Sequence, residues 1–425
     1  MIRPTPLWRS VAVLGVAGLV LTACGNGDTE TEEPKTSESS SSAPSGAKGD
    51  GTLKIGTLLP QTGSLAFLGP PEFAGVDLAL QDINDAGGVN GKQVEKVDSD
   101  SGDTSTDTAS QSVDRLLSQN VDAIIGAASS SVSLSVIDKI TGNGVLQISP
   151  ANTSDELTNY DDKGLYFRTA PPDVLQGRVL GDLILSDGNT TLGILALQDA
   201  YGTGLADNAE KSFTDGGGQV VEKVIYDPKA ASFSTEVGKI KAADPEAIAV
   251  IAFDETKKII PELVKQGIGP ANKKIYFVDG NLANYDKDFP KGTLDGVKGT
   301  LPGVAATDEF KQRLLSVAPD LTEFAYAPES YDATIVVALA AEAAGDDSGA
   351  SIASKMQDVS SGGEKCTSYK DCLALLKDGK DIDYDGVSGP IEFNDKGDPS
   401  KASVGIYQYG ADNKYTFVEA KEGTI

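Results

Sequence analysis

Two short apolar segments of the sequence run directly into residues that carry hydroxyl and amide groups. Residues 124–125 are followed by Ser129–Ser131, and residues 146–148 are followed by Asn152 and Thr153. If both segments are strands of a parallel sheet, their carboxyl ends meet at one edge, where helices begin and backbone N–H groups are free. Such an edge suits a carboxylate. The alternative is that the serines cap a helix and that Asn152 and Thr153 form a turn.

The composition excludes several kinds of chemistry. The 425 residues include no histidine and carry a formal net charge of -27. This charge argues against nucleic acid as a partner because phosphates would be repelled. Without histidine the Ser-His pair is impossible, and no Gly-x-Ser-x-Gly turn precedes a helix, so an amidase or esterase using Ser130 would need a Ser-Lys mechanism. We therefore expect no enzyme activity, no metal and no cofactor.

The first residues have the pattern of a secretory signal that ends in a lipobox. Two arginines precede the apolar residues 11–21, and small residues lead to Cys24. The apolar run is too short to span a bilayer comfortably. We expect residues 1–23 to be a signal peptide and Cys24 to carry the lipid that anchors the protein to the extracytoplasmic face of the cell membrane. Residues 25–50, rich in Ser, Thr, Glu, Pro and Gly, are expected to form a disordered tether.

The other two cysteines, Cys366 and Cys372, lie close together in the sequence. Outside the cytoplasm such a pair forms a small-loop disulfide more often than a redox or zinc site, because two thiols without histidine partners make an incomplete zinc set. We expect a disulfide here.

The elements that position these residues follow a repeated pattern of strand and helix. From residue 52, short β-rich runs alternate with amphipathic helical stretches, and a second series restarts after the prolines at 171–172. About 375 residues exceed what one core usually organises, so we expect an α/β fold of two similar lobes, each a parallel-type sheet flanked by helices. The predicted strands are 53–60, 93–100, 121–126, 145–149, 191–197, 219–226, 247–253 and 274–280, the predicted helices are 73–86, 106–119, 133–141, 174–186, 204–215, 233–242, 257–266 and 330–344, and a β-rich tail covers 391–394, 403–409 and 415–420.

Several blocks of the sequence resemble one family in the family's own order. They are IGTLLPQTGSLAFLGPPEFAGVDLALQDINDAGGVNGKQVE, IIGAASSSVSLSV, LQISPANTSDELT, YFRTAPPD, QDAYGTGLAD and SFSTEVGKIKAADPEAIAV. The chain is similar to the type I periplasmic solute-binding proteins of ABC transporters, in the group of the leucine/isoleucine/valine-binding proteins. The resemblance implies that the two lobes are hinged. The expected first lobe is 51–171 with about 300–350, and the expected second lobe is 172–299 with about 351–425.

The resemblance also implies a set of ligand-binding residues. In that family the strand-end serine and the Ser-Pro-Ala-x-Thr loop hold an amino-acid carboxylate, the aromatic residue of a Tyr-Gly-x-Gly element packs on the ligand, and an acidic residue of the second lobe receives the ammonium. Asp279, which precedes a glycine, could instead only shape a turn, and Asp254 is a second candidate. The positions implied here are Ser130, Ala151, Asn152, Thr153, Tyr201, Phe253, Asp279, Leu68 and Tyr326.

The function that the resemblance implies is capture of a small amino acid, of the branched-chain type, between two closing lobes and its delivery to a permease in the membrane. The protein is expected to act as a monomer. Two alternatives keep the fold and change the role: the ligand is urea, a short amide or an aromatic acid, or the protein is a ligand sensor for another partner.

Overall fold

The computed structural model of the chain describes residues 49–425. The expected signal peptide, Cys24 as the expected lipid attachment site and nearly all of the expected tether lie outside these residues. Within residues 49–425, no helix is both long and apolar enough to cross a membrane.

The first sheet has five strands, all parallel, in the order β2-β1-β3-β4-β5. Every residue of β3 and β4 is buried, as expected for central strands of a parallel sheet covered on both faces. The strands are β1 (Lys54–Leu59), β2 (Glu95–Asp100), β3 (Ala123–Gly126), β4 (Leu146–Ser149) and β5 (Tyr166–Arg168).

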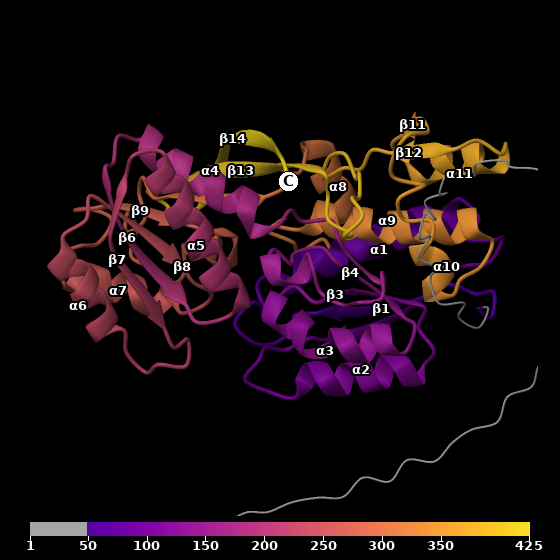
Figure 1. Cartoon of the computed structure of the whole chain (residues 1–425), viewed down its shortest axis with the longest axis horizontal. Helices are drawn as coiled ribbons and strands as arrows, with labels where there is room; N and C mark the ends of the chain where they lie inside the picture. The colour runs from indigo at the N-terminus through magenta and orange to yellow at the C-terminus, as the bar shows by residue number, and fades with distance from the viewer. Residues whose placement is uncertain (1–48) are drawn as a thin grey trace, which may run out of the picture. The chain divides into compact units, whose positions relative to one another are not determined.

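Helices cover both faces of this sheet, and we call the whole arrangement the first lobe. Figure 1 shows α2 and α3 on one face and α1 and α9 on the other, in agreement with two separate apolar clusters. Residues 327–341 of α9 are all buried, so this helix is covered on every side. The helices are α1 (Gly69–Asp85), α2 (Thr108–Ser118), α3 (Ser130–Gly142), α8 (Asp308–Val317), α9 (Ala327–Ala344), α10 (Gly349–Ala353) and α11 (Tyr369–Lys377).

The second sheet has seven strands in the order β14-β13-β10-β9-β8-β6-β7. Strands β6 to β10 are parallel, and β13 and β14 add an antiparallel edge. The strands are β6 (Thr191–Leu197), β7 (Gln219–Tyr226), β8 (Ala247–Ile251), β9 (Lys274–Phe277), β10 (Lys298–Pro302), β13 (Lys401–Tyr409) and β14 (Tyr415–Thr424). The expected α/β fold, with parallel-type sheets flanked by helices, is confirmed.

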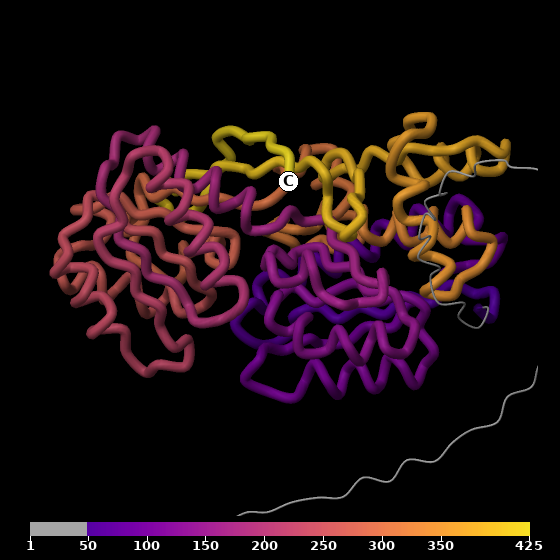
Figure 2. Tube along the Cα trace, in the orientation of Figure 1, coloured from indigo at the N-terminus to yellow at the C-terminus, as the bar shows by residue number. Residues whose placement is uncertain are grey.

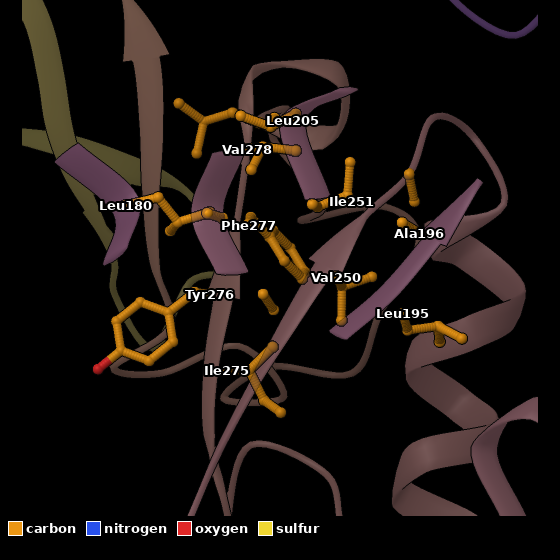
Figure 3. Packing of buried hydrophobic residues seen from close by; sticks show 14 of the residues in the cluster. Leu180, Leu195, Ala196, Leu205, Val250, Ile251, Ile275, Tyr276, Phe277 and Val278 are labelled. Carbon is orange, nitrogen blue, oxygen red and sulfur yellow. The ribbon is translucent and has the colours of Figure 1, made fainter. Parts of the chain in front are cut away.

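Four helices pack on this sheet, and we call this arrangement the second lobe. Figure 3 shows its core, where Leu195, Val250 and Ile275 come from three neighbouring strands and Leu180 and Leu205 come from two helices. The helices are α4 (Asp173–Ser186), α5 (Ala200–Asp215), α6 (Ser234–Ala243) and α7 (Thr256–Lys265).

The chain passes between the two sheets three times, at residues 169–172, 303–307 and 385–400. The last of these crossings differs from the expected division, which assigned everything after about 350 to the second lobe. Figure 2 shows the orange segment that contains α10 and α11 running beside the indigo start of the described chain. Ile352, Met356 and Tyr369 bury their side chains in the α1–α9 cluster, and the Tyr369 hydroxyl donates to the Gly88 carbonyl at 3.0 Å. Apolar burial therefore holds residues 349–384 in the first lobe.

The small two-stranded sheet of this segment carries the cysteine pair. Strand β11 (Glu364–Cys366) is parallel to β12 (Ile382–Tyr384), and α11 lies between them in the chain. Cys366 and Cys372 are bonded in the structure, with their Cα atoms 5.3 Å apart, and both are buried.

Candidate functional site

A small cavity lies where the carboxyl ends of strands from both sheets face each other. We call it the strand-end cavity. It has a volume of about 10 Å³, room for about one water molecule. Its lining comes from the loop before α1, the ends of β3, β4, β8 and β9, and the starts of α5 and α9. The residues are Leu65, Leu68, Ala128, Ser129, Ser130, Ala151, Tyr201, Phe253, Asp279, Gly280 and Tyr326.

Helix α3 begins at the rim of this cavity, earlier than the sequence pattern indicates. The Ser129 side chain caps it and accepts a hydrogen bond from the Val132 N–H at 3.4 Å. Ser130 is therefore the first helical residue, and its Oγ accepts the N–H groups of Thr153 and Ser154, both at 3.2 Å. The Ser130 hydroxyl hydrogen remains free to be donated, and the helix N-terminus favours an anion beside it.

The loop after β4 contributes only Ala151 to the lining. The Asn152 amide donates to the carbonyls of Ala127 and Ala128, both at 2.9 Å, and accepts the Tyr166 hydroxyl at 2.9 Å. Because of these bonds, the Asn152 side chain points toward the interior of the first lobe and away from the cavity. Thr153 is buried, and its side chain does not reach the cavity either.

Asp279 is the only acidic residue among those that line the strand-end cavity. It begins a short 3₁₀ helix (Asp279–Asn281) after β9 and is 5 % exposed. Its Oδ1 accepts hydrogen bonds from the Tyr201 hydroxyl at 2.7 Å and the Gln176 amide at 2.8 Å, and its Oδ2 accepts the Tyr326 hydroxyl at 2.7 Å. All of these donors are neutral.

No lysine or arginine among residues 49–425 forms an ion pair with Asp279. The buried Arg168 guanidinium is paired with Asp398, at 2.6 Å. Burial raises the pKa of the Asp279 carboxyl above its ordinary value, while the bonds from Tyr201, Gln176 and Tyr326 oppose that rise. Burial also raises the pKa of Asp173, and the neighbouring Thr153 hydroxyl opposes that rise. The lining of the cavity thus presents one acidic group, Asp279, without a cationic partner among residues 49–425, and a cationic group on a ligand would offset its charge.

Aromatic and aliphatic side chains form the rest of the wall. The rings of Tyr201 and Phe253 stack with their centroids 5.5 Å apart and an interplanar angle of 9°. Leu65 and Leu68 face the same space from the loop before α1. Asp254, the alternative acid, is outside the cavity, because its exposed carboxylate pairs with Lys257 at 2.7 Å.

Hydrogen bonds join the two lobes beside the cavity. The Ser131 hydroxyl donates to Asp199 Oδ2 at 3.2 Å and accepts the Ala200 N–H at 3.1 Å, and the Ser154 hydroxyl donates to the Ala200 carbonyl at 3.1 Å. Because Asp199 caps α5, these bonds fix the helix that carries Tyr201 against the loops that carry Ser130 and Ala151.

Four lining residues are outside the set of ligand-binding residues that the resemblance implies, namely Leu65, Ala128, Ser129 and Gly280. Ala128 and Ser129 belong to the strand-end segment after residues 124–125, and Gly280 follows Asp279 directly. Leu65 shares a turn with Leu68, whose N–H donates to the Leu65 carbonyl at 2.9 Å. Proximity along the chain to residues already chosen is the signal that could have found all four.

Comparison with known sequences agrees with this architecture. A family described as periplasmic binding protein matches residues 52–407. The Leu/Ile/Val-binding protein homolog 1 of Brucella abortus is 26% identical over 379 residues, which cover 86% of this chain and 93% of the relative.

Two solved structures show the same fold. The branched-chain amino acid transporter substrate binding protein of Streptococcus pneumoniae, in complex with isoleucine, has a TM-score of 0.72 and 22% identity and covers 88% of this chain and 100% of its own. A solute binding protein from R. palustris in complex with benzoate has a TM-score of 0.70 and 19% identity and covers 88% of this chain and 97% of its own.

Proposed function

Because the chain belongs to the periplasmic binding protein family, we propose that it captures a small amino acid, of the branched-chain type, in the strand-end cavity and hands it to an ABC permease. It acts as a binding protein and not as an enzyme. The hydrogen bonding and charge of the cavity support this ligand class, and the relatives named for leucine, isoleucine and valine agree with it.

The observation that carries the proposal is the environment of Asp279. Its buried carboxylate accepts hydrogen bonds from Tyr201, Gln176 and Tyr326 and has no cationic partner among residues 49–425. A buried charge is costly unless it is paired, so a ligand that brings an ammonium group is stabilised there. A ligand without a cationic group would leave the buried Asp279 charge unpaired.

The opposite side of the cavity suits the other end of an amino acid. Ser129 and Ser130 lie at the N-terminus of α3, where the helix dipole and the first-turn N–H groups attract a carboxylate. Leu65, Leu68 and the stacked Tyr201–Phe253 pair provide apolar contacts for a branched side chain. We propose that Ser130, Ala151, Tyr201, Phe253, Asp279, Leu68 and Tyr326 contact the ligand, and that Asn152 and Thr153 support them from behind.

Binding requires the lobes to separate and close again. A cavity of about 10 Å³ is far smaller than an amino acid. Hinged closure around a ligand is general for periplasmic binding proteins, and contacts such as Ser131 to Asp199 form only when the lobes meet. The closed form would then signal occupancy to the permease, and a lipid on Cys24 with the tether at 25–50 would keep the protein at the outer face of the membrane.

Titration calorimetry with ligand-free protein tests the proposal. Leucine, isoleucine and valine are titrated into wild type, Asp279→Asn and, as a matched control, Asp254→Asn, which removes an exposed acid of the same lobe. We expect Asp279→Asn to weaken binding at least about 30-fold, because truncating one partner of a buried charge pair costs about 2 kcal/mol or more. The control should retain the wild-type affinity. Equal affinity of both variants, or no binding of any amino acid, would contradict the proposal.

An aromatic acid is the second candidate, favoured by the stacked Tyr201–Phe253 pair and by the benzoate complex of the R. palustris relative. A benzoate anion near an ionised Asp279 would be repelled, so it fits only if that carboxyl holds its proton. Benzoate binding that strengthens or persists in Asp279→Asn, with no binding of leucine, would establish this alternative.

A further inference from the structure

A much larger pocket lies at the three chain crossings between the lobes, away from the strand-end cavity. We call it the hinge pocket, and its volume is about 530 Å³. Each of the three crossings contributes to its lining, the first through Thr169, the second through Gly303 and the third through Ser388. Residues 401–403 and 422–424, which belong to the antiparallel edge of the second sheet, line one side of the pocket. No residue of the strand-end cavity lines it.

The hinge pocket has the character of a small-molecule site. Its volume falls within the range of ~300–1,000 Å³ that ligand pockets usually have, and such pockets combine an apolar lining with a few polar groups. Much of the wall is apolar and stiff, because three prolines take part in it. These apolar residues are Pro171, Val304, Pro390, Ile391, Pro399 and Ala402.

The carboxyl group of Glu329 is the buried polar group of this wall. Glu329 lies in the first turn of α9 and is 2 % exposed. No other residue among residues 49–425 donates a hydrogen bond to its carboxyl oxygens, although its backbone carbonyl accepts the Thr169 hydroxyl at 2.9 Å. The carboxyl points at Gly303, where a Cβ atom would come within 2.0 Å of Oε1. Glycine thus leaves the carboxyl in contact with the pocket.

The buried groups around Glu329 would not compensate a negative charge on its carboxyl. Glu72, on α1, is fully buried, and neither of its carboxylate oxygens has a hydrogen-bond partner in the described part of the chain; Asp332 lies one turn further along α9. Burial raises the pKa of Glu329 to about 8, with a contribution from Asp332. At the pocket, Lys401 is largely exposed and lies 3.7 Å from Glu392, and Glu422 is exposed. The buried end of the pocket therefore favours a cationic group.

We propose that the hinge pocket is a second ligand site, which takes a small molecule with an apolar body and a primary amine, the amine pairing with the Glu329 carboxylate. An occupant would touch all three crossings at once. Its affinity would then depend on the angle between the lobes, and by linkage it would change the affinity of the strand-end cavity by the same factor.

Binding of benzylamine and benzyl alcohol tests this site, because the two probes share a ring and differ in charge. Both probes are titrated into the protein that carries Asp279→Asn, so that the acid of the strand-end cavity does not contribute to amine binding. The backbone amide signal of Gly303 is followed by NMR. We expect benzylamine to bind at least about tenfold more tightly than benzyl alcohol, with the Gly303 signal shifting in both titrations.

Two further variants decide where and how the probes bind. Glu329→Gln should remove the advantage of the amine and leave benzyl alcohol within about twofold, because the amide keeps the shape of the acid but cannot become an anion. Ala402→Trp should weaken both probes by filling the pocket. If that variant does not fold, the Gly303 signal still shows where the probes bind, and Glu329→Gln still shows whether the amine pairs with the acid. Equal affinity for the two probes, an amine affinity that Glu329→Gln does not change, or no binding at millimolar concentration would overturn the proposal.

Discussion

The Ser131 hydroxyl lies 3.2 Å from a carboxylate oxygen of Asp199, although the two residues belong to different lobes. Ser131 stands in the first turn of α3 and Asp199 caps α5, so the bond links the two helices whose starts border the strand-end cavity. It can exist only while the lobes are closed.

Replacing Ser131 with alanine is therefore expected to favour the open arrangement. The loss of this bond should cost the closed form ~0.5–1.5 kcal/mol and lower ligand affinity by about three- to tenfold. Calorimetry gives the affinity, and small-angle X-ray scattering of the ligand-free protein should show a larger radius of gyration. Ser135→Ala is the matched control, because that exposed hydroxyl of the same helix bonds only to the Val132 carbonyl. An unchanged affinity and radius in Ser131→Ala would mean that this contact does not hold the lobes together.

Tyr326 offers a second test, because within residues 49–425 its hydroxyl donates to one oxygen of Asp279 and to no other group. Tyr326→Phe keeps the ring and removes the donor, so the pKa of Asp279 should rise further and amino-acid affinity should fall about tenfold, as expected for a bond to a charged group. Tyr409→Phe is the control: this tyrosine is equally buried in the second lobe, and its hydroxyl donates to the Ala283 carbonyl at 2.8 Å. Equal affinity of the two variants would exclude a role for the Tyr326 hydroxyl.

The strands of the second lobe show why much of the fold is predictable. The predicted strands at 191–197 and 219–226 coincide with β6 and β7, because β-branched and aromatic residues are bounded there by turn residues. Strand β10 was missed, since Lys298–Pro302 contains glycine and proline and is held by its neighbours β9 and β13. The expected strand at 391–394 does not form. Phe393 makes only an isolated bridge to Pro399, and its ring packs on Phe167 at 5.3 Å.

The location of the strand-end cavity can be predicted from the sequence more fully than the directions of the side chains around it. Strand ends, and hence Ser130 and Asp279, can be placed from periodicity and from a family pattern. The direction of the Asn152 side chain cannot be predicted in this way. It depends on hydrogen bonds to the carbonyls of Ala127 and Ala128, which take their positions only when the loop after β3 is folded. Three donors around one carboxylate likewise come from α4, α5 and the start of α9, and nothing local in the sequence indicates that they converge.

Arg168 and Asp398 form a fully buried pair that should be important for stability. Arg168 Nε lies 2.6 Å from Asp398 Oδ1, its Nη1 donates to the carbonyls of Asn152 and Ser154, and its Nη2 donates to the Thr158 hydroxyl. Asp398→Ala would leave the guanidinium without its counter-charge, and we expect a loss of about 3–5 kcal/mol in the free energy of unfolding. Denaturant unfolding measures this loss. Asp395→Ala, an exposed acid of the same segment, should change little.

The disulfide between Cys366 and Cys372 can be tested chemically. Peptide mapping without reductant should recover the two cysteines in one cross-linked species whose mass is lower by two hydrogens than the reduced form. Cys366→Ser with Cys372→Ser should lower the free energy of unfolding by about 2 kcal/mol, the chain-entropy value for so short a loop. Two free thiols that react with an alkylating reagent in the unfolded, unreduced protein would show that the bond does not form.

Glu329 should make stability depend on pH in a way that one substitution removes. Burial raises its pKa from an ordinary value of 4.5 to about 8. Between these two values the folded chain keeps a proton that the unfolded chain has released, so this residue stabilises the fold less and less as pH rises from about 4.5 to about 8. Glu329→Gln does not titrate, and its stability relative to wild type should rise across that range by about 5 kcal/mol, since one pKa unit corresponds to about 1.4 kcal/mol. Thermal melts at several pH values measure this, with the exposed Glu309→Gln as control. A constant difference between Glu329→Gln and wild type would mean that Glu329 is ionised in the folded protein, and that something in the hinge pocket compensates its charge.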